Sequence, residues 1–154
     1  MKLFLVQHGE ALSKEIDPDR PLSEAGWRDV QKLADFLSHL DMGVQRVWHS
    51  GKTRAEQTAG LLAQAILPHG QAESVSGLAP NDDVIAFAAR LDTGGPATVL
   101  VGHLPFMARL TANLLVGDPQ TELVTFKPGS MVCLEYTEGD GWRLDWMLRP
   151  ELLP

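Results

Sequence analysis

Three short apolar runs recur along the chain, and each ends in glycine or polar residues. They occupy residues 3–6, 46–50 and 97–103. The first run is apolar at every position, which is typical of a strand buried on both faces, and the other two carry β-branched residues. The pattern predicts three buried strands, each leading into a helix.

Helical periodicity fills the stretches between these runs. Leucine and phenylalanine recur at i, i+3, i+4 and i+7 spacing over residues 33–40, which predicts a helix from residue 23 to about residue 40. Small and apolar side chains repeat this spacing in a second predicted helix from residue 53 to about residue 66. The alternation of strands and helices indicates a largely parallel sheet.

Two further helices are expected in the second half. One runs through residues 84–91, with Asn81 or Asp82 as its N-terminal cap. The other opens at residues 104–106, where Pro105 fits the first turn because no hydrogen bond is lost there.

The C-terminal part has the pattern of a β-hairpin. Residues 130–136 and 142–148 are strand-like and flank the turn sequence TEGDG at 137–141. Together these elements predict an α/β fold: a three-layer sandwich with a mostly parallel central sheet, helices on both faces and a C-terminal hairpin. No linker or repeat divides the chain, so we expect a single domain over residues 1–154.

Charge and composition narrow the classes of partner. Lysine and arginine total 13 against 20 aspartate and glutamate residues, a formal net charge of −7, which opposes nucleic acid or an anionic membrane surface as the main partner. The single cysteine, Cys133, excludes an internal disulfide framework. No apolar run approaches the roughly 20 residues of a membrane-spanning helix, so a cytoplasmic protein is expected.

Polar residues that suit phosphoryl transfer follow the three predicted strands. His8 follows the first strand, Arg54 lies just beyond the second, and His103 ends the third. Because carboxyl ends of parallel strands share one sheet edge, we expect these side chains to meet. An imidazole nitrogen can attack phosphorus, while a second imidazolium and a guanidinium stabilise the charge on the transferred group. Gly9 and Gly102 let the backbone approach an anion closely.

Four segments of the chain carry a resemblance to a known family. They are His8-Gly9, residues 20–26 (RPLSEAG), residues 50–59 (SGKTRAEQTA) and residues 101–105 (VGHLP). In this order, each at a predicted strand end or helix start, they resemble the histidine phosphatase superfamily, and within it the SixA-type phosphohistidine phosphatases. The resemblance implies a phosphoglycerate mutase-like fold and no metal or other cofactor.

The resemblance also implies roles for single residues. His8 is expected to be the nucleophile that forms a phosphohistidine intermediate, with Arg54 and His103 as the catalytic residues that hold the phosphate oxygens. The expected substrate-binding residues are Gln7, Gly9, Ser13 and Arg20. The implied partner is a phosphohistidine-bearing protein or a small phosphorylated molecule, with its phosphate in the pocket.

The chain departs from the family pattern at two positions. Gln7 stands where the family motif has arginine, and an amide lacks the guanidinium charge and its bidentate fork, a difference on the order of 10²-fold in rate. Gly77 stands where an acidic proton donor is expected, which makes the nearby Asp82 the candidate donor. A missing acid favours phosphohistidine as substrate, because a leaving imidazole can take its proton from solvent.

Alternative interpretations remain open from the sequence. A module that binds phosphate or a phosphoprotein with little turnover agrees with Gln7. A phosphatase for a small metabolite agrees with the short chain and an open pocket. His49 adjoins the predicted site, and a strand-end side chain that supports the loop is favoured over a metal ligand because no metal-ligand spacing accompanies it.

Overall fold

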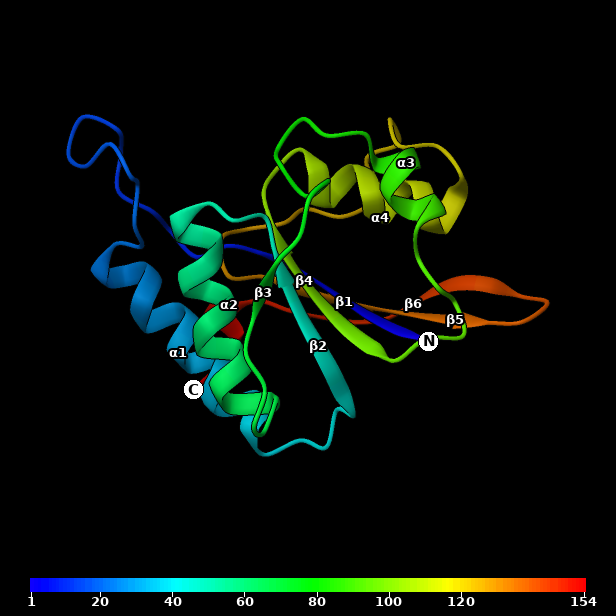
Figure 1. Cartoon of the computed structure of the whole chain (residues 1–154), viewed down its shortest axis with the longest axis horizontal. Helices are drawn as coiled ribbons and strands as arrows, with labels where there is room; N and C mark the ends of the chain where they lie inside the picture. The colour runs from blue at the N-terminus through cyan, green and yellow to red at the C-terminus, as the bar shows by residue number, and fades with distance from the viewer.

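The computed structural model describes all residues 1–154, built around one six-stranded sheet of order β3-β2-β4-β1-β5-β6. The strands are β1 (Lys2–Gln7), β2 (Val44–His49), β3 (Glu73–Ser74), β4 (Ala97–Gly102), β5 (Met131–Thr137) and β6 (Gly141–Leu148). The helices are α1 (Glu24–Ser38), α2 (Thr53–Ile66), α3 (Val84–Ala89) and α4 (Phe106–Val116), with a final 3-10 turn, η1 (Pro150–Leu152). Helices α1 and α2 cover one face of the sheet, and α3 and α4 cover the other (Figure 1).

The expected three-layer α/β fold is confirmed, with one difference in the sheet. Strands β2, β4 and β1 run parallel, as predicted, and the short strand β3 pairs parallel with β2. The C-terminal hairpin joins the sheet beside β1, and both its pairings are antiparallel. The sheet is therefore mixed rather than mostly parallel. Strand β3 was not predicted, because two exposed residues carry no hydrophobic pattern.

Strand β1 shows why the sheet holds the two helical layers together. Phe4 and Val6 pack into the cluster under α1 and α2, whereas Leu3 and Leu5 pack into the cluster under α3 and α4. All four side chains are buried, as their uninterrupted apolar run predicted. Burying each such side chain is worth roughly 1.5–3 kcal/mol, so β1 anchors the residues that follow it.

The helix starts follow capping chemistry, with one prediction wrong. Ser23 caps α1, and its hydroxyl accepts a hydrogen bond from the Gly26 amide at 3.0 Å. Helix α3 is capped by Asp83, whose carboxylate accepts from the amides of Ile85 and Ala86, and not by Asn81 or Asp82. The carboxylate of Asp82 instead accepts from the Ala79 amide in the preceding turn. Residues 81–83 are all of types that commonly cap helices, so the sequence did not determine where α3 begins.

None of the helices has both the length and the apolar character that crossing a membrane requires.

Candidate active site

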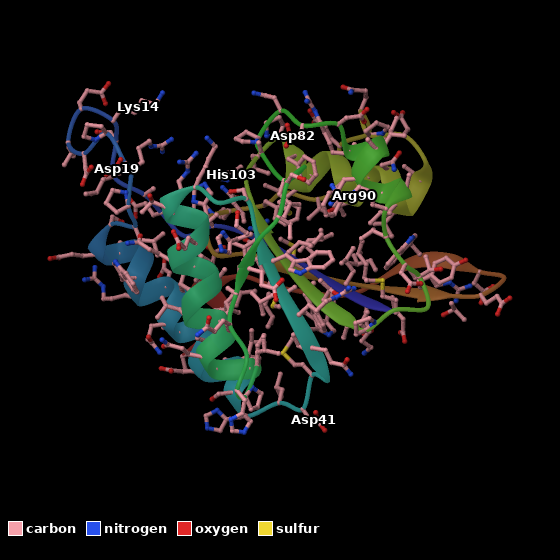
Figure 2. All side chains as sticks on the ribbon, in the orientation of Figure 1. Lys14, Asp19, Asp41, Asp82, Arg90 and His103 are labelled. Atoms are coloured by element: carbon pink, nitrogen blue, oxygen red, sulfur yellow. The ribbon has the colours of Figure 1, made fainter.

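Three neighbouring strands deliver the candidate residues to one edge of the sheet. His8 follows β1 and His103 follows β4, and their ring centroids lie 4.9 Å apart. Arg54 lies in the first turn of α2, with its Nε 3.3 Å from His8 Nε2. The structure thus brings together the three residues that the sequence predicted to meet, around the labelled His103 in Figure 2.

The hydrogen bonds of His8 fix which ring nitrogen carries the proton. Nδ1 lies 2.6 Å from the carbonyl oxygen of Gly9, which can only accept, so Nδ1 is the protonated nitrogen. Nε2 faces the Nε–H of Arg54, which can only donate, so Nε2 carries the free lone pair. The backbone therefore orients an imidazole whose unprotonated nitrogen points toward the guanidinium.

Both histidines are uncharged near neutral pH. Burial is the main cause that lowers the pKa of His8 to about 4, and the Arg54 charge lowers it further. Burial, then the neighbouring His8 and Arg54, lower the pKa of His103 to about 3. The sequence led us to expect an imidazolium as the second group, but the lowered pKa of His103 makes its ring neutral near pH 7. A bound phosphoryl dianion would favour its protonation because opposite charges stabilise each other.

Ser50 is a site residue for which the sequence suggested no role. Its hydroxyl oxygen lies 2.7 Å from His103 Nε2, and it also accepts from the Lys52 amide at 3.3 Å. The other ring nitrogen of His103, Nδ1, is buried without a partner. Ser50 is thus the side chain that orients the His103 ring. Its position directly after β2, next to β4 in the sheet, was the signal available in the sequence.

Thr58 joins the nucleophile loop to the helix that carries Arg54. Its hydroxyl donates to the Arg54 carbonyl at 2.8 Å and accepts from the Gly9 amide at 3.1 Å. The Gly9 amide, expected to approach substrate, is therefore occupied by Thr58. A side chain at Gly9 would also meet Val30 Cγ2 at 2.7 Å, so glycine is required there for packing under α1.

Gln7 is buried, with 8% of its surface exposed, and its Oε1 has no hydrogen-bond partner. It lies opposite Gly102 in the register of β1 and β4, one residue before the nucleophile. The amide brings no charge to the end of β1. A buried acceptor without a protein partner is costly in a folded protein, and a water or a ligand at this position would supply the missing donor.

Arg20 lies at the rim of a cavity of about 470 Å³ beside Arg54. Its backbone is left-handed, with φ at +48°, and its Nε donates to the Leu12 carbonyl at 3.0 Å. Burial and the Arg20 charge both lower the pKa of Arg54, which indicates that the two guanidinium groups are close. The rim position expected for Arg20 agrees with this geometry.

Two predicted residues are not drawn into contact with the histidines. Ser13 is exposed, and its carbonyl, not its hydroxyl, accepts hydrogen bonds from the amides of Ile16 and Asp17. Asp82 is exposed and hydrogen-bonded within its own turn.

His49 is buried, and its Nδ1 accepts from the Gly51 amide at 3.0 Å, which is the loop-supporting role favoured from the sequence. No group of three or more histidine, cysteine, aspartate or glutamate residues is placed to hold a metal ion.

Comparisons with known proteins agree with this geometry. The model of the histidine phosphatase superfamily (branch 1) matches residues 3–79. The phosphohistidine phosphatase SixA of Escherichia coli (strain K12) is 30% identical over 97% of this chain and 94% of its own length. A solved structure of the protein histidine phosphatase SixA complexed with tungstate aligns over 99% of both chains, with 27% identity and a TM-score of 0.85. The α-ribazole phosphatase from Shigella flexneri, at 17% identity and a TM-score of 0.80 over 97% of both chains, shares the fold.

Proposed function

The chain belongs to the histidine phosphatase superfamily and is a phosphatase, and from that premise we propose that it hydrolyses phosphohistidine through a covalent intermediate on His8. One observation carries the proposal. His8 is held with Nδ1 protonated against Gly9 and with a free lone pair on Nε2 beside the Arg54 guanidinium. An uncharged, oriented imidazole next to a cation is the arrangement that a phosphoryl-accepting nucleophile requires.

The first step transfers the phosphoryl group to His8. The Nε2 lone pair forms a bond to phosphorus while the P–N bond to the substrate imidazole breaks. The leaving imidazole keeps that electron pair and takes its proton from solvent. The Arg54 Nε–H donates to the His8 Nε2 lone pair at 3.3 Å, so a bound phosphate must draw this donor onto its own oxygens before attack.

The second step restores the enzyme. A water oxygen forms a bond to phosphorus, the P–Nε2 bond breaks, and the electron pair returns to His8. The water gives a proton to solvent, and inorganic phosphate leaves. Arg54 and His103 stabilise the equatorial oxygens in both steps, and Ser50 holds the His103 ring in place through its hydrogen bond at 2.7 Å.

The chemistry of the leaving group favours phosphohistidine over an alkyl phosphate as the substrate. An alkoxide needs a positioned acid, and the candidate acid Asp82 is exposed and binds the Ala79 amide. An imidazole leaving group does not need that acid. A protein-borne or free phosphohistidine is therefore the substrate class that these residues support best. The identity of the E. coli relative as a phosphohistidine phosphatase supports the same choice.

The test is phosphate release from phosphohistidine by the wild type, by His8→Ala and by His39→Ala. His39 is an exposed histidine at the C-terminal end of α1, so it is the matched control. We expect His8→Ala to lose at least about 10³-fold in kcat and His39→Ala to keep the wild-type rate. An acid-labile phosphate should be trapped on His8 in the wild type. Full turnover by His8→Ala contradicts the proposal.

Two outcomes favour the other functions considered. A faster rate on sugar phosphates than on phosphohistidine indicates a metabolite phosphatase. Phosphate binding by the wild type without release from any substrate indicates a binding module, for which the neutral Gln7 is the supporting observation.

A further inference from the structure

Four cations gather around the cavity beside the candidate active site. The cavity of about 470 Å³ is lined without any hydrophobic side chain, and its cations are Lys14, Arg20, Lys52 and Arg54. None of the four takes part in a salt bridge, although the chain carries 20 acidic residues against 13 basic ones. Asp19 is the one acidic residue of the lining. The cavity is a local excess of positive charge in an acidic protein.

Arg20 is held in a conformation that local sequence preference does not explain. A non-glycine residue at φ +48° is uncommon, because L side chains are strained in the left-handed region. Its Nε–H is fixed to the Leu12 carbonyl at 3.0 Å, while its two terminal nitrogens have no hydrogen-bond partner. The loop around it is closed by a bridge between Ala11 and Leu22. The result is a guanidinium that is oriented in advance and free to bind an anion.

The charge around the cavity exceeds what one transferred phosphoryl group uses. Arg54 contacts the nucleophile directly, which leaves Lys14, Arg20 and Lys52 without an anion. Lys14 lies on a loop that extends away from the helices and from His103 (Figure 2). Lys52, by contrast, is the residue that immediately precedes helix α2. Positive charge spread over a loop and a helix start matches acidic side chains spread over a protein surface.

We propose that Lys14, Arg20 and Lys52 form a second anion subsite, which receives carboxylates flanking the phosphohistidine of a protein substrate. The inference rests on the proposed function for the phosphohistidine itself. Cations at this cavity attract acidic side chains of a partner locally, although the net charge of the protein is −7.

The test measures binding, so that it does not depend on turnover. Two peptides carry a phosphoryl-triazole in place of phosphohistidine, one flanked by glutamates and the other by glutamines. At low ionic strength we expect the wild type to bind the glutamate peptide about 10-fold more tightly, because three exposed ion pairs add modestly. The preference should fall to about 2-fold in Arg20→Gln/Lys52→Gln, fall partly in Lys14→Gln, and shrink as salt is added.

Arg143→Gln is the matched control. It removes one positive charge, as Lys14→Gln does, but from an exposed position on strand β6 of the C-terminal hairpin, so it should leave the preference unchanged. Equal affinity of the wild type for the two peptides overturns the inference, and so does an equal loss in the control and in the double variant. Phosphate release from phosphoramidate by the wild type is measured separately. Failure of that release counts against the proposed function, whereas the peptide preference alone decides the subsite.

Discussion

At the scale of single residues, the candidate site contains uncharged side chains at a position where an anion is expected to bind. His8 and His103 lose their protons because burial penalises the charged ring and because cations face them. Gln7 adds an amide where a charge would strengthen phosphate binding. The positive potential of the candidate site therefore comes from arginine and lysine side chains alone.

Replacing Gln7 with arginine should strengthen phosphate binding. The new guanidinium would supply a charge-assisted bidentate contact, so we expect about 10-fold tighter binding of inorganic phosphate, measured by calorimetry. Without phosphate, the unpaired buried charge should lower the free energy of unfolding by about 1–3 kcal/mol. Gln7→Asn, which keeps an amide, is the control. Weaker phosphate binding by Gln7→Arg would indicate a pocket built around the amide.

Ser50→Ala should slow the reaction while leaving the fold intact. The substitution removes the hydroxyl that lies 2.7 Å from His103 Nε2, so the ring loses its only side-chain hydrogen-bond partner. We expect kcat to fall about 10-fold and the melting temperature to change little, because Ser50 is only half-buried. Ser50→Thr keeps a hydroxyl and should recover most of the rate. A wild-type kcat in Ser50→Ala would remove Ser50 from the mechanism.

At the scale of elements, the site depends on the close fit between α1 and the loop that follows β1. A Cβ on Gly26 would lie 2.1 Å from the Glu10 carbonyl oxygen, a backbone atom that cannot move aside cheaply. The same carbonyl accepts from the Ser23 amide at 2.9 Å. The first turn of α1 is thereby locked against the loop that leads from the nucleophile to Arg20.

Two helical glycines give a matched test of this fit. Gly26→Ala should lower the free energy of unfolding by about 2–4 kcal/mol, because the new methyl group collides with backbone. Gly60→Ala lies in α2, where nothing stands within 4 Å of the new methyl, and it should raise stability by about 0.5–1 kcal/mol. Chemical denaturation of both variants measures the difference. Equal stabilities would show that α1 moves to accommodate the methyl group.

The elements were largely predictable from the sequence, and the exceptions have local causes. The three buried parallel strands, the two long helices and the hairpin follow from uninterrupted or periodic apolar positions. Strand β3 could not be predicted, since its two exposed residues pair only because β2 ends beside them. The α3 cap was misplaced because Asn81, Asp82 and Asp83 all suit a cap, and the choice among them depends on the turn at Ala79.

The site was predictable where a strand end fixed the position of a residue. His8, Arg54 and His103 meet because sheet order places their elements side by side. The contacts of Ser50 and Thr58 depend on side-chain rotamers across two elements, which no spacing rule gives. The backbone strain at Arg20 is likewise a property of the folded loop.

At the scale of the whole molecule, burial of the two histidines makes stability depend on pH. Their folded pKa values, about 4 and about 3, lie below the unfolded value of 6.5, so the unfolded state binds more protons in this range. Above pH 6.5 both states are neutral and the stability is complete. As the pH falls from 6.5 toward 4, stability is lost.

We therefore expect the free energy of unfolding in phosphate-free buffer to fall by about 3–6 kcal/mol between pH 6.5 and pH 4, beyond the loss caused by carboxylates. His8→Asn/His103→Asn lacks the two titrating rings and isolates their share. Urea denaturation at each pH should give a shallower profile for this variant. If stability falls equally with pH in the wild type and in the double variant, the two histidines are not the cause of the pH dependence.

The position of β4 between β2 and β1 sets the order in which the protein can acquire its site during synthesis. Strands β1 and β2 are made first, yet they are not neighbours in the sheet, and β4 (Ala97–Gly102) must be inserted between them. His103 leaves the ribosome directly after that strand. A nascent chain that stops short of β4 therefore lacks both His103 and the strand that lies between β1 and β2. The candidate site is therefore complete only when the parallel part of the sheet is complete.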